Sequence, residues 1–124
     1  MGRRATTTVL VCTCLVGAVV PLNGAEPLTM RVSPVIAPEP AVLRVIAVVE
    51  TDDRNRSLEI IAKSDDFFRS SQIQLDGQNA RRVSDFEFRD VPRGNYEVTA
   101  ILAGTGGRRA AVTRSVIVVG RLSR

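Results

Sequence analysis

The side chains that most often do chemistry in proteins are scarce in this sequence. It contains no histidine, and its two cysteines are Cys12 and Cys14. Histidine is the usual general base, and histidine and cysteine are the usual zinc ligands. A serine nucleophile needs an adjacent base, but the one lysine, Lys63, precedes Ser64 on an extended stretch where neighbours point to opposite faces. We therefore expect a protein that is not an enzyme and that carries no cofactor.

Two aspartate pairs could bind a metal ion, because hard carboxylates suit calcium. They are Asp52-Asp53 and Asp65-Asp66, and the residues between them predict a strand at 57–64. At about 3.3 Å per residue this strand spans roughly 23–27 Å, so the pairs cannot share one ion. We expect no metal site. Asp52 and Asp53 are the residues that calcium would use, and the alternative is that both pairs are solvated loop ends.

Arginine pairs and net charge bear on anionic partners. Arg81-Arg82 and Arg108-Arg109 could bind phosphate or anionic sugars in bidentate fashion, or they are solvated charges that protect a strand edge. The sequence has 17 basic and 13 acidic residues. The cleavage that we expect after Ala25 would remove Arg3 and Arg4, which leaves 15 basic and 13 acidic residues and a net charge of +2. With no tryptophan and one tyrosine, we expect no nucleic-acid partner.

The N-terminal residues 1–25 have the layout of a secretory signal peptide. A basic start at Arg3 and Arg4 precedes an apolar run at 9–20, and small residues end the segment at Ala25. The run is shorter than the roughly 20 residues that span a membrane. We expect cleavage after Ala25, export to the periplasm or extracellular space, and no membrane insertion afterwards. An uncleaved anchor is the alternative.

The rest of the chain indicates a single all-β domain. Residues 26–40 contain four of the six prolines and predict an N-terminal edge strand and connector. Residues 41–120 form the expected core, and 121–124 a short basic tail. About seven short strands indicate one antiparallel sandwich without a disulfide. The expected strands are Met30–Ile36, Val42–Val49, Ser57–Ser64, Phe68–Leu75, Ala80–Phe88, Gly94–Leu102 and Ala110–Val119. A tight hairpin turn is expected at Asp76-Gly77.

The stretch Phe86–Leu102 carries the most specific pattern. Phe86 and Phe88 share one face of a strand, Pro92 and Gly94 suit a type I turn, and Tyr96 begins the next strand. The run Gly-Asn-Tyr-Glu-Val-Thr-Ala resembles the sixth strand of immunoglobulin-like and fibronectin type III-like sandwiches, where a tyrosine bonds backward to form a corner. It is also similar to prealbumin-like sandwiches. The resemblance implies a fold and no catalytic residues.

An apolar outer face suggests how the domain works. Val42, Ile46 and Val48, with Ile61, could form a surface that contacts a protein partner or a second copy. The alternative is that the proline-rich segment covers them. We expect a non-catalytic exported module that binds proteins or has a structural role in the cell envelope or extracellular space. A carbohydrate- or surface-ligand-binding module is the alternative, although few aromatic residues are available for stacking on sugars.

Overall fold

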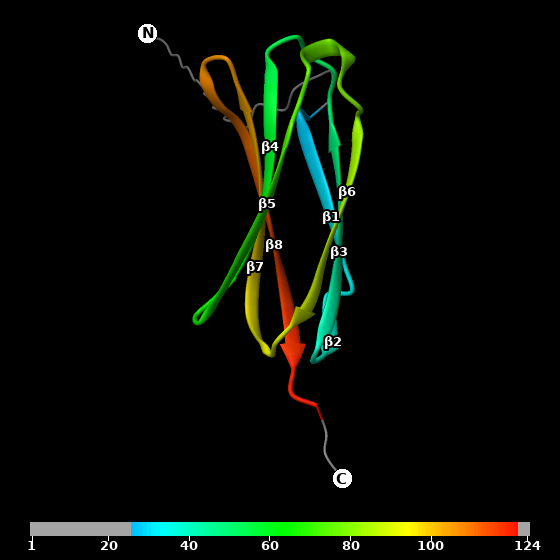
Figure 1. Cartoon of the computed structure of the whole chain (residues 1–124), viewed down its shortest axis with the longest axis vertical. Coiled ribbons are helices and arrows are strands. Elements are labelled where there is room, and N and C mark those ends of the chain that lie inside the picture. Colours follow the sequence, from blue (N-terminus) through cyan, green and yellow to red (C-terminus); the bar gives the residue numbers. More distant parts are fainter. Residues whose placement is uncertain (1–25, 122–124) are drawn as a thin grey trace, which may run out of the picture.

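The structure, a computed structural model, describes residues 26–121 as eight strands in two facing layers (Figure 1). The predicted signal peptide with Cys12 and Cys14, and most of the basic tail, lie outside the described residues. In chain order the elements are β1 (Leu28–Ser33), β2 (Ile36–Pro38), β3 (Ala41–Val49), β4 (Asn55–Ser64), β5 (Phe67–Gln74), the 3₁₀ turn η1 (Gly77–Asn79), β6 (Val83–Val91), β7 (Gly94–Gly104) and β8 (Gly107–Val119).

One sheet has the order β1-β3-β6 and the other the order β2-β8-β7-β4-β5. The all-β sandwich is confirmed, but the prediction of a purely antiparallel arrangement is wrong, because β2 pairs in parallel with β8. The parallel pairing arises in the proline-rich segment, residues 26–40. Its first part, β1, pairs with β3, and after Pro34 the chain crosses to the other layer to form β2.

Period-two alternation explains which residues form the core. On β3, Leu43, Val45 and Ala47 point inward and are fully buried. Leu28 and Met30 on β1 belong to the same buried cluster, so the N-terminal segment is part of the sandwich. Each large apolar side chain that leaves water stabilises the fold by roughly 1.5–3 kcal/mol.

The chain passes between the layers through a two-residue link from β6 to β7. Phe86 and Phe88 share one face of β6, as the sequence predicts, and this face is buried in the core. After the link, Tyr96 is 2% exposed, and its hydroxyl donates a hydrogen bond of 2.7 Å to the Pro92 carbonyl oxygen. Gly94 makes room, because a Cβ there would lie 3.2 Å from the Tyr96 ring. This is the backward hydrogen bond that the resemblance implies.

The predicted hairpin at Asp76-Gly77 is wrong, because β5 and β6 belong to different sheets. The chain instead crosses through η1, where Gly77 adopts a φ of +53°. The crossing brings the apolar face of β6 against the inner face of the other layer. A hairpin would have placed β6 beside β5 in one sheet and removed two phenylalanines, Phe86 and Phe88, from the opposite wall of the core.

We expect Tyr96→Phe to lower the free energy of unfolding by roughly 0.5–1.5 kcal/mol, since it removes the hydroxyl that bonds to Pro92 and keeps the buried ring. Denaturant unfolding of both proteins measures the difference. The edge-to-face contact with the Phe67 ring, at 5.7 Å between centroids, is retained in the variant. An unchanged unfolding midpoint would contradict a stabilising role of the hydroxyl.

Candidate functional site

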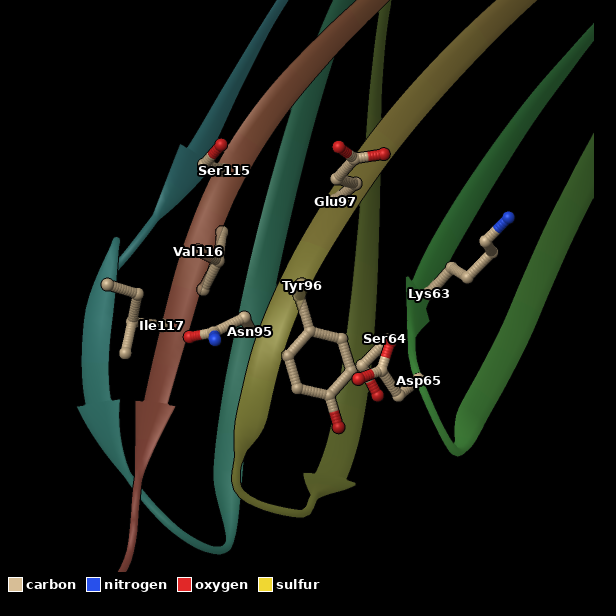
Figure 2. A pocket seen from close by; sticks show the side chains of 9 residues that line it. All are labelled: Lys63, Ser64, Asp65, Asn95, Tyr96, Glu97, Ser115, Val116 and Ile117. Atoms are coloured by element: carbon tan, nitrogen blue, oxygen red, sulfur yellow. The ribbon is translucent and has the colours of Figure 1, made fainter.

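The first candidate site is an open pocket of about 520 Å³ beside Tyr96, where the end of β4 meets the start of β7 and the end of β8 (Figure 2). Polar side chains from these strands line it, among them Lys63, Ser64, Asp65 and Glu97. In Figure 2 the Lys63 side chain extends away from Ser64 and from the Tyr96 ring. Burial raises the pKa of the Tyr96 phenol, so it stays protonated at neutral pH.

This pocket gathers polar groups without arranging them for nucleophilic chemistry. The Ser64 hydroxyl oxygen is shielded from solvent and makes no hydrogen bond to any residue between 26 and 121. Lys63, the amine nearest in sequence, is exposed on the other face of β4. Because a serine nucleophile needs a base within hydrogen-bonding distance, the pocket lacks the pair that the reaction would require.

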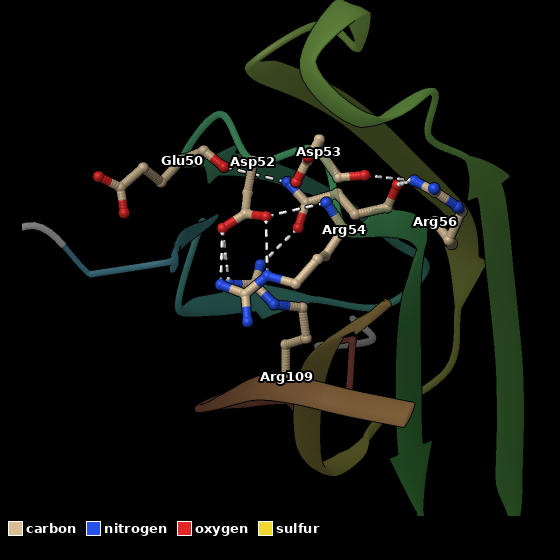
Figure 3. Close-up of polar contacts among 7 residues, drawn as sticks. Glu50, Asp52, Asp53, Arg54, Arg56 and Arg109 are labelled. Carbon is tan, nitrogen blue, oxygen red and sulfur yellow. Dashed lines mark hydrogen bonds and ion pairs between the residues drawn. The ribbon is translucent and has the colours of Figure 1, made fainter. Parts of the chain in front are cut away.

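The second candidate is a polar cluster at the opposite end of the sandwich, centred on Asp52 (Figure 3). Asp52 Oδ1 accepts hydrogen bonds from the Arg54 backbone N–H at 2.8 Å and from Arg54 Nε at 3.0 Å. Asp52 Oδ2 accepts from Arg54 Nη2 at 2.9 Å and from Arg109 Nη2 at 3.1 Å. The hydrogen bonds from Arg54 and the charge of Arg109 hold the Asp52 pKa well below its usual range.

Arg109 extends the cluster to a buried amide. Its Nη1 donates to Asn55 Oδ1 at 2.5 Å, and Asn55 Nδ2 donates to the Glu50 carbonyl oxygen at 3.0 Å. Asn55 is 1% exposed, so both ends of its amide are satisfied inside the fold. Gly104 permits the close approach, since a Cβ there would lie 2.6 Å from the Arg54 carbonyl oxygen and 2.7 Å from Arg109 Cδ. The cluster therefore ties the β3–β4 loop to the start of β8.

This geometry bears on the calcium and anion hypotheses. Both oxygens of Asp52 are engaged by guanidinium groups, so a calcium ion would have to displace two cations. Asp53 is exposed, and its backbone carbonyl, not its carboxylate, accepts a hydrogen bond from Arg56. Between residues 26 and 121 no group of three or more acidic, histidine or cysteine side chains could hold a metal ion. Of the Arg108-Arg109 pair, Arg109 is committed to Asp52 and Asn55.

The third candidate is the apolar surface that the sequence predicts. Val42, Ile46 and Val48 lie together on the outer face of β3, and Val42 is 44% exposed. Ile61 is not with them, because β4 belongs to the other sheet. The proline-rich segment pairs beside β3 through β1 and, within the described chain, does not cover this outer face.

Val83, which the sequence pattern did not assign to this surface, lies opposite Val48 in the pairing of β6 with β3 and is 52% exposed. The alternation of β6 around Phe86 and Phe88 already placed Val83 on the outer face, but only strand pairing puts it next to β3. We name the half-buried Ile46 and Val48, together with the exposed Val83, the outer patch. The Arg44–Asp85 ion pair, at 3.3 Å, lies beside it.

A further group of exposed apolar side chains was also missed. Ile36 on β2 lies opposite Ile117 on β8, and both are exposed together with Val35 and Val119. In residues 26–121 there is no helix long and apolar enough to cross a membrane. The fold and surfaces thus define a small all-β sandwich protein, and most of its exposed large apolar residues between 26 and 121 lie on strands.

Comparison with known proteins shows that this chain is similar in fold to solved structures of other proteins. No protein-family model and no curated protein matches the chain. A superoxide reductase (neelaredoxin) from Ignicoccus hospitalis is similar in structure, with a TM-score of 0.60, 10% identity, and coverage of 76% of this chain and 81% of that chain. A family 76 glycoside hydrolase from a bovine Bacteroides thetaiotaomicron strain gives a TM-score of 0.52 and 18% identity over 76% of this chain. This chain covers 20% of the hydrolase. At these identities the similarities show the fold alone.

We expect Asp52→Asn to lower the melting temperature at pH 7, because it removes the carboxylate that pairs with Arg54 and Arg109. The Asp52 pKa is lower in the folded state than in the unfolded state, so its stabilisation is present above the unfolded value of about 4 and is lost as the pH falls. The difference between variant and wild type should therefore narrow in acid. Thermal unfolding across this pH range measures it.

Asp53→Asn is the matched control, because it removes the same charge one residue away. Its carboxylate takes part in no ion pair within residues 26–121, and we expect its melting temperature to stay near wild type. Equal losses in the two variants, or an Asp52→Asn deficit that persists unchanged in acid, would contradict the role given to the Asp52 ion pairs.

Proposed function

We propose that this protein is a non-catalytic, exported sandwich of immunoglobulin-like type that acts as a protein-interaction or structural module of the cell envelope or extracellular space. The observation that carries the proposal is the outer patch of Ile46, Val48 and Val83 on the three-stranded sheet. Val83 is exposed and the half-buried Ile46 and Val48 adjoin it, and apolar side chains grouped at a surface often mark an interaction site.

The immunoglobulin-like type is supported by strand order and by the corner at Tyr96. In such sandwiches the first, second and fifth strands share one sheet, and a tyrosine near the start of the sixth strand bonds backward after the chain crosses from the fifth. When β1 and β2 are counted as one strand divided between the sheets, β1-β3-β6 has this order, and β7 is the sixth strand. Tyr96 is the third residue of β7 and follows the crossing from β6.

The surroundings of the outer patch support a protein partner. Exposed charged residues, among them Arg31, Arg44 and Glu87, lie on the same outer face. An apolar centre with a polar rim is the usual composition of a protein interface. Arg31 lies opposite Ile46 in the pairing of β1 with β3, so charge and apolar area meet directly. A partner with an apolar centre and charges of both signs would match this surface.

We expect Val83→Asp to remove the protein from its native complex without unfolding it, since the side chain is 52% exposed and the new charge would be desolvated only in the complex. Cross-linking in the protein's own cells, followed by native size measurement, detects the loss. Val119→Asp is the control, because Val119 is 42% exposed and lies on the other sheet. A wild-type protein that migrates alone, or equal behaviour of both variants, would reject the outer patch as the interface.

Export is tested separately by the intact mass of the protein recovered from its own cells. Cleavage after Ala25 predicts an N-terminus at Glu26 and a soluble protein outside the cytoplasm. Recovery of Met1–Ala25 with the domain, in membranes, would support the anchored alternative and reject this part of the proposal.

A further inference from the structure

The two sheets leave several edges, and most of them carry features that oppose pairing with another chain. Because β2 pairs only with Ile117–Val119 of β8, the earlier part of β8 also has an open edge, and it includes the charged Arg108 and Arg114. β1 lies against β8. The short strand β2 ends in Pro38, with Pro34 before it and Pro40 after it, and proline offers no N–H to a further strand. The outward side chains of β6 include Asp85, Glu87 and Arg89, and charges of this kind discourage edge pairing.

The edge of β5 lacks these devices. Its eight residues, Phe-Phe-Arg-Ser-Ser-Gln-Ile-Gln, include no proline, no glycine and a single charge, on Arg69. That charge does not guard the edge, because Arg69 Nη1 donates to the Arg89 carbonyl oxygen at 2.7 Å and its guanidinium lies 4.9 Å from the centre of the Phe67 ring. Within residues 26–121, β5 pairs with β4 alone.

The pairing with β4 determines which backbone groups of β5 are free. Leu75 N donates to the Arg56 carbonyl oxygen, and residues alternate between bonded and non-bonded positions along an antiparallel ladder. Odd-numbered residues of β5 therefore bond to β4. The N–H and C=O groups of the even-numbered residues, Phe68, Ser70, Gln72 and Gln74, point to the open edge, and these four residues are all exposed.

The space beside this edge is open. A groove of about 470 Å³ separates β5 from β6. It is lined by Ser71 and Ile73 of β5, by Ser84, Asp85, Phe86 and Glu87 of β6, and by Arg81. The inward-facing side chains of an added strand would therefore border a groove and not a closed wall. Strand addition commonly uses this combination of main-chain bonds and an adjacent cavity for side chains.

The sequence of β5 is compatible with antiparallel pairing to the β5 strand of a second copy. Antiparallel pairing about a two-fold axis places Ser71 opposite Ser71 of the second copy, Ser70 opposite Gln72, and Phe68 opposite Gln74. All four free-edge residues then form bonded pairs, two small serines meet at the axis, and Arg69 faces Ile73 in place of another arginine. Like charges directly opposite each other destabilise a sheet, and this register places none opposite each other.

We propose that two copies of this protein pair through β5 to form one continuous ten-stranded sheet with Ser71 at the two-fold axis. The contact is isologous, as in most two-fold dimers. It goes beyond the proposed function, because it uses an edge of the five-stranded sheet and leaves the outer patch free. The Val83→Asp variant should therefore still dimerise, so failure of one proposal does not entail failure of the other.

The register is tested by cysteine cross-linking. Ser71→Cys places two thiols in a non-bonded antiparallel pair, where Cα atoms lie about 4.5 Å apart, within the range that a disulfide spans. Oxidation should give a covalent dimer. Ser70→Cys is the control, because in this register the two residues 70 are offset along the strands beyond disulfide reach. The wild-type protein is oxidised in parallel. It controls for disulfides formed by Cys12 or Cys14 in any protein that retains residues 1–25.

The pairing itself is tested by Gln72→Pro, which removes an N–H from the free edge without touching the bonds to β4. By symmetry each dimer loses two hydrogen bonds, so the dissociation constant from a sedimentation concentration series should rise on the order of tenfold or more. Gln72→Thr keeps the N–H and should dimerise like wild type. Circular dichroism verifies that the strands are retained.

Charge-swapped variants provide a second route if Gln72→Pro does not fold. Ser71→Lys and Ser71→Asp should each be monomeric, because like charges meet at the axis, and mixing them should restore a dimer. A wild-type protein that stays monomeric at every concentration would overturn the proposal. So would dimers that tolerate Gln72→Pro, or covalent dimers formed by Ser70→Cys and not by Ser71→Cys.

Discussion

The two sheets of this protein are held together by one shared layer of apolar side chains, and within residues 26–121 there is no cysteine to add a covalent link. The strands must therefore present largely apolar inner faces, and most polar groups buried where the chain passes between the layers need a hydrogen-bond partner. The link from β6 to β7 shows how this is done. Tyr96 contributes a large ring to the core, and its hydroxyl, which would be costly to bury alone, bonds to the Pro92 carbonyl.

The opposite end of the sandwich uses charge for a similar purpose. The β3–β4 loop brings Asp52 against Arg54, and β8 supplies Arg109, which also satisfies the buried Asn55 amide. Gly104 has no side chain to obstruct this approach. The cluster thus connects a loop to a strand that is distant in sequence. Its residues are occupied with one another, which favours a structural role over a ligand-binding one.

Our proposals place the contacts with other molecules on one sheet face and one strand edge. The outer patch on the three-stranded sheet and the open edge of β5 are independent features, one made of side chains and the other of backbone groups. An edge without protection is a liability in a protein that acts alone. These two surfaces are the basis of our proposal that the protein is part of an assembly.

The sequence by itself determined where most of the strands lie and which residues share a face, because alternation and turn chemistry are local properties. It placed Phe86 and Phe88 on one face of a strand, and the structure shows that this face is buried. The tertiary structure alone decided which strands are neighbours. It paired β2 in parallel with β8, replaced the expected hairpin at Asp76-Gly77 with a crossing between layers, and separated Ile61 from Val42. It also joined Asp52 to Arg109, 57 residues later. The alternation of side chains along a strand determines the face to which each residue points, but it does not determine which strand pairs with which. Strand pairing depends on how all the apolar faces pack together into one core.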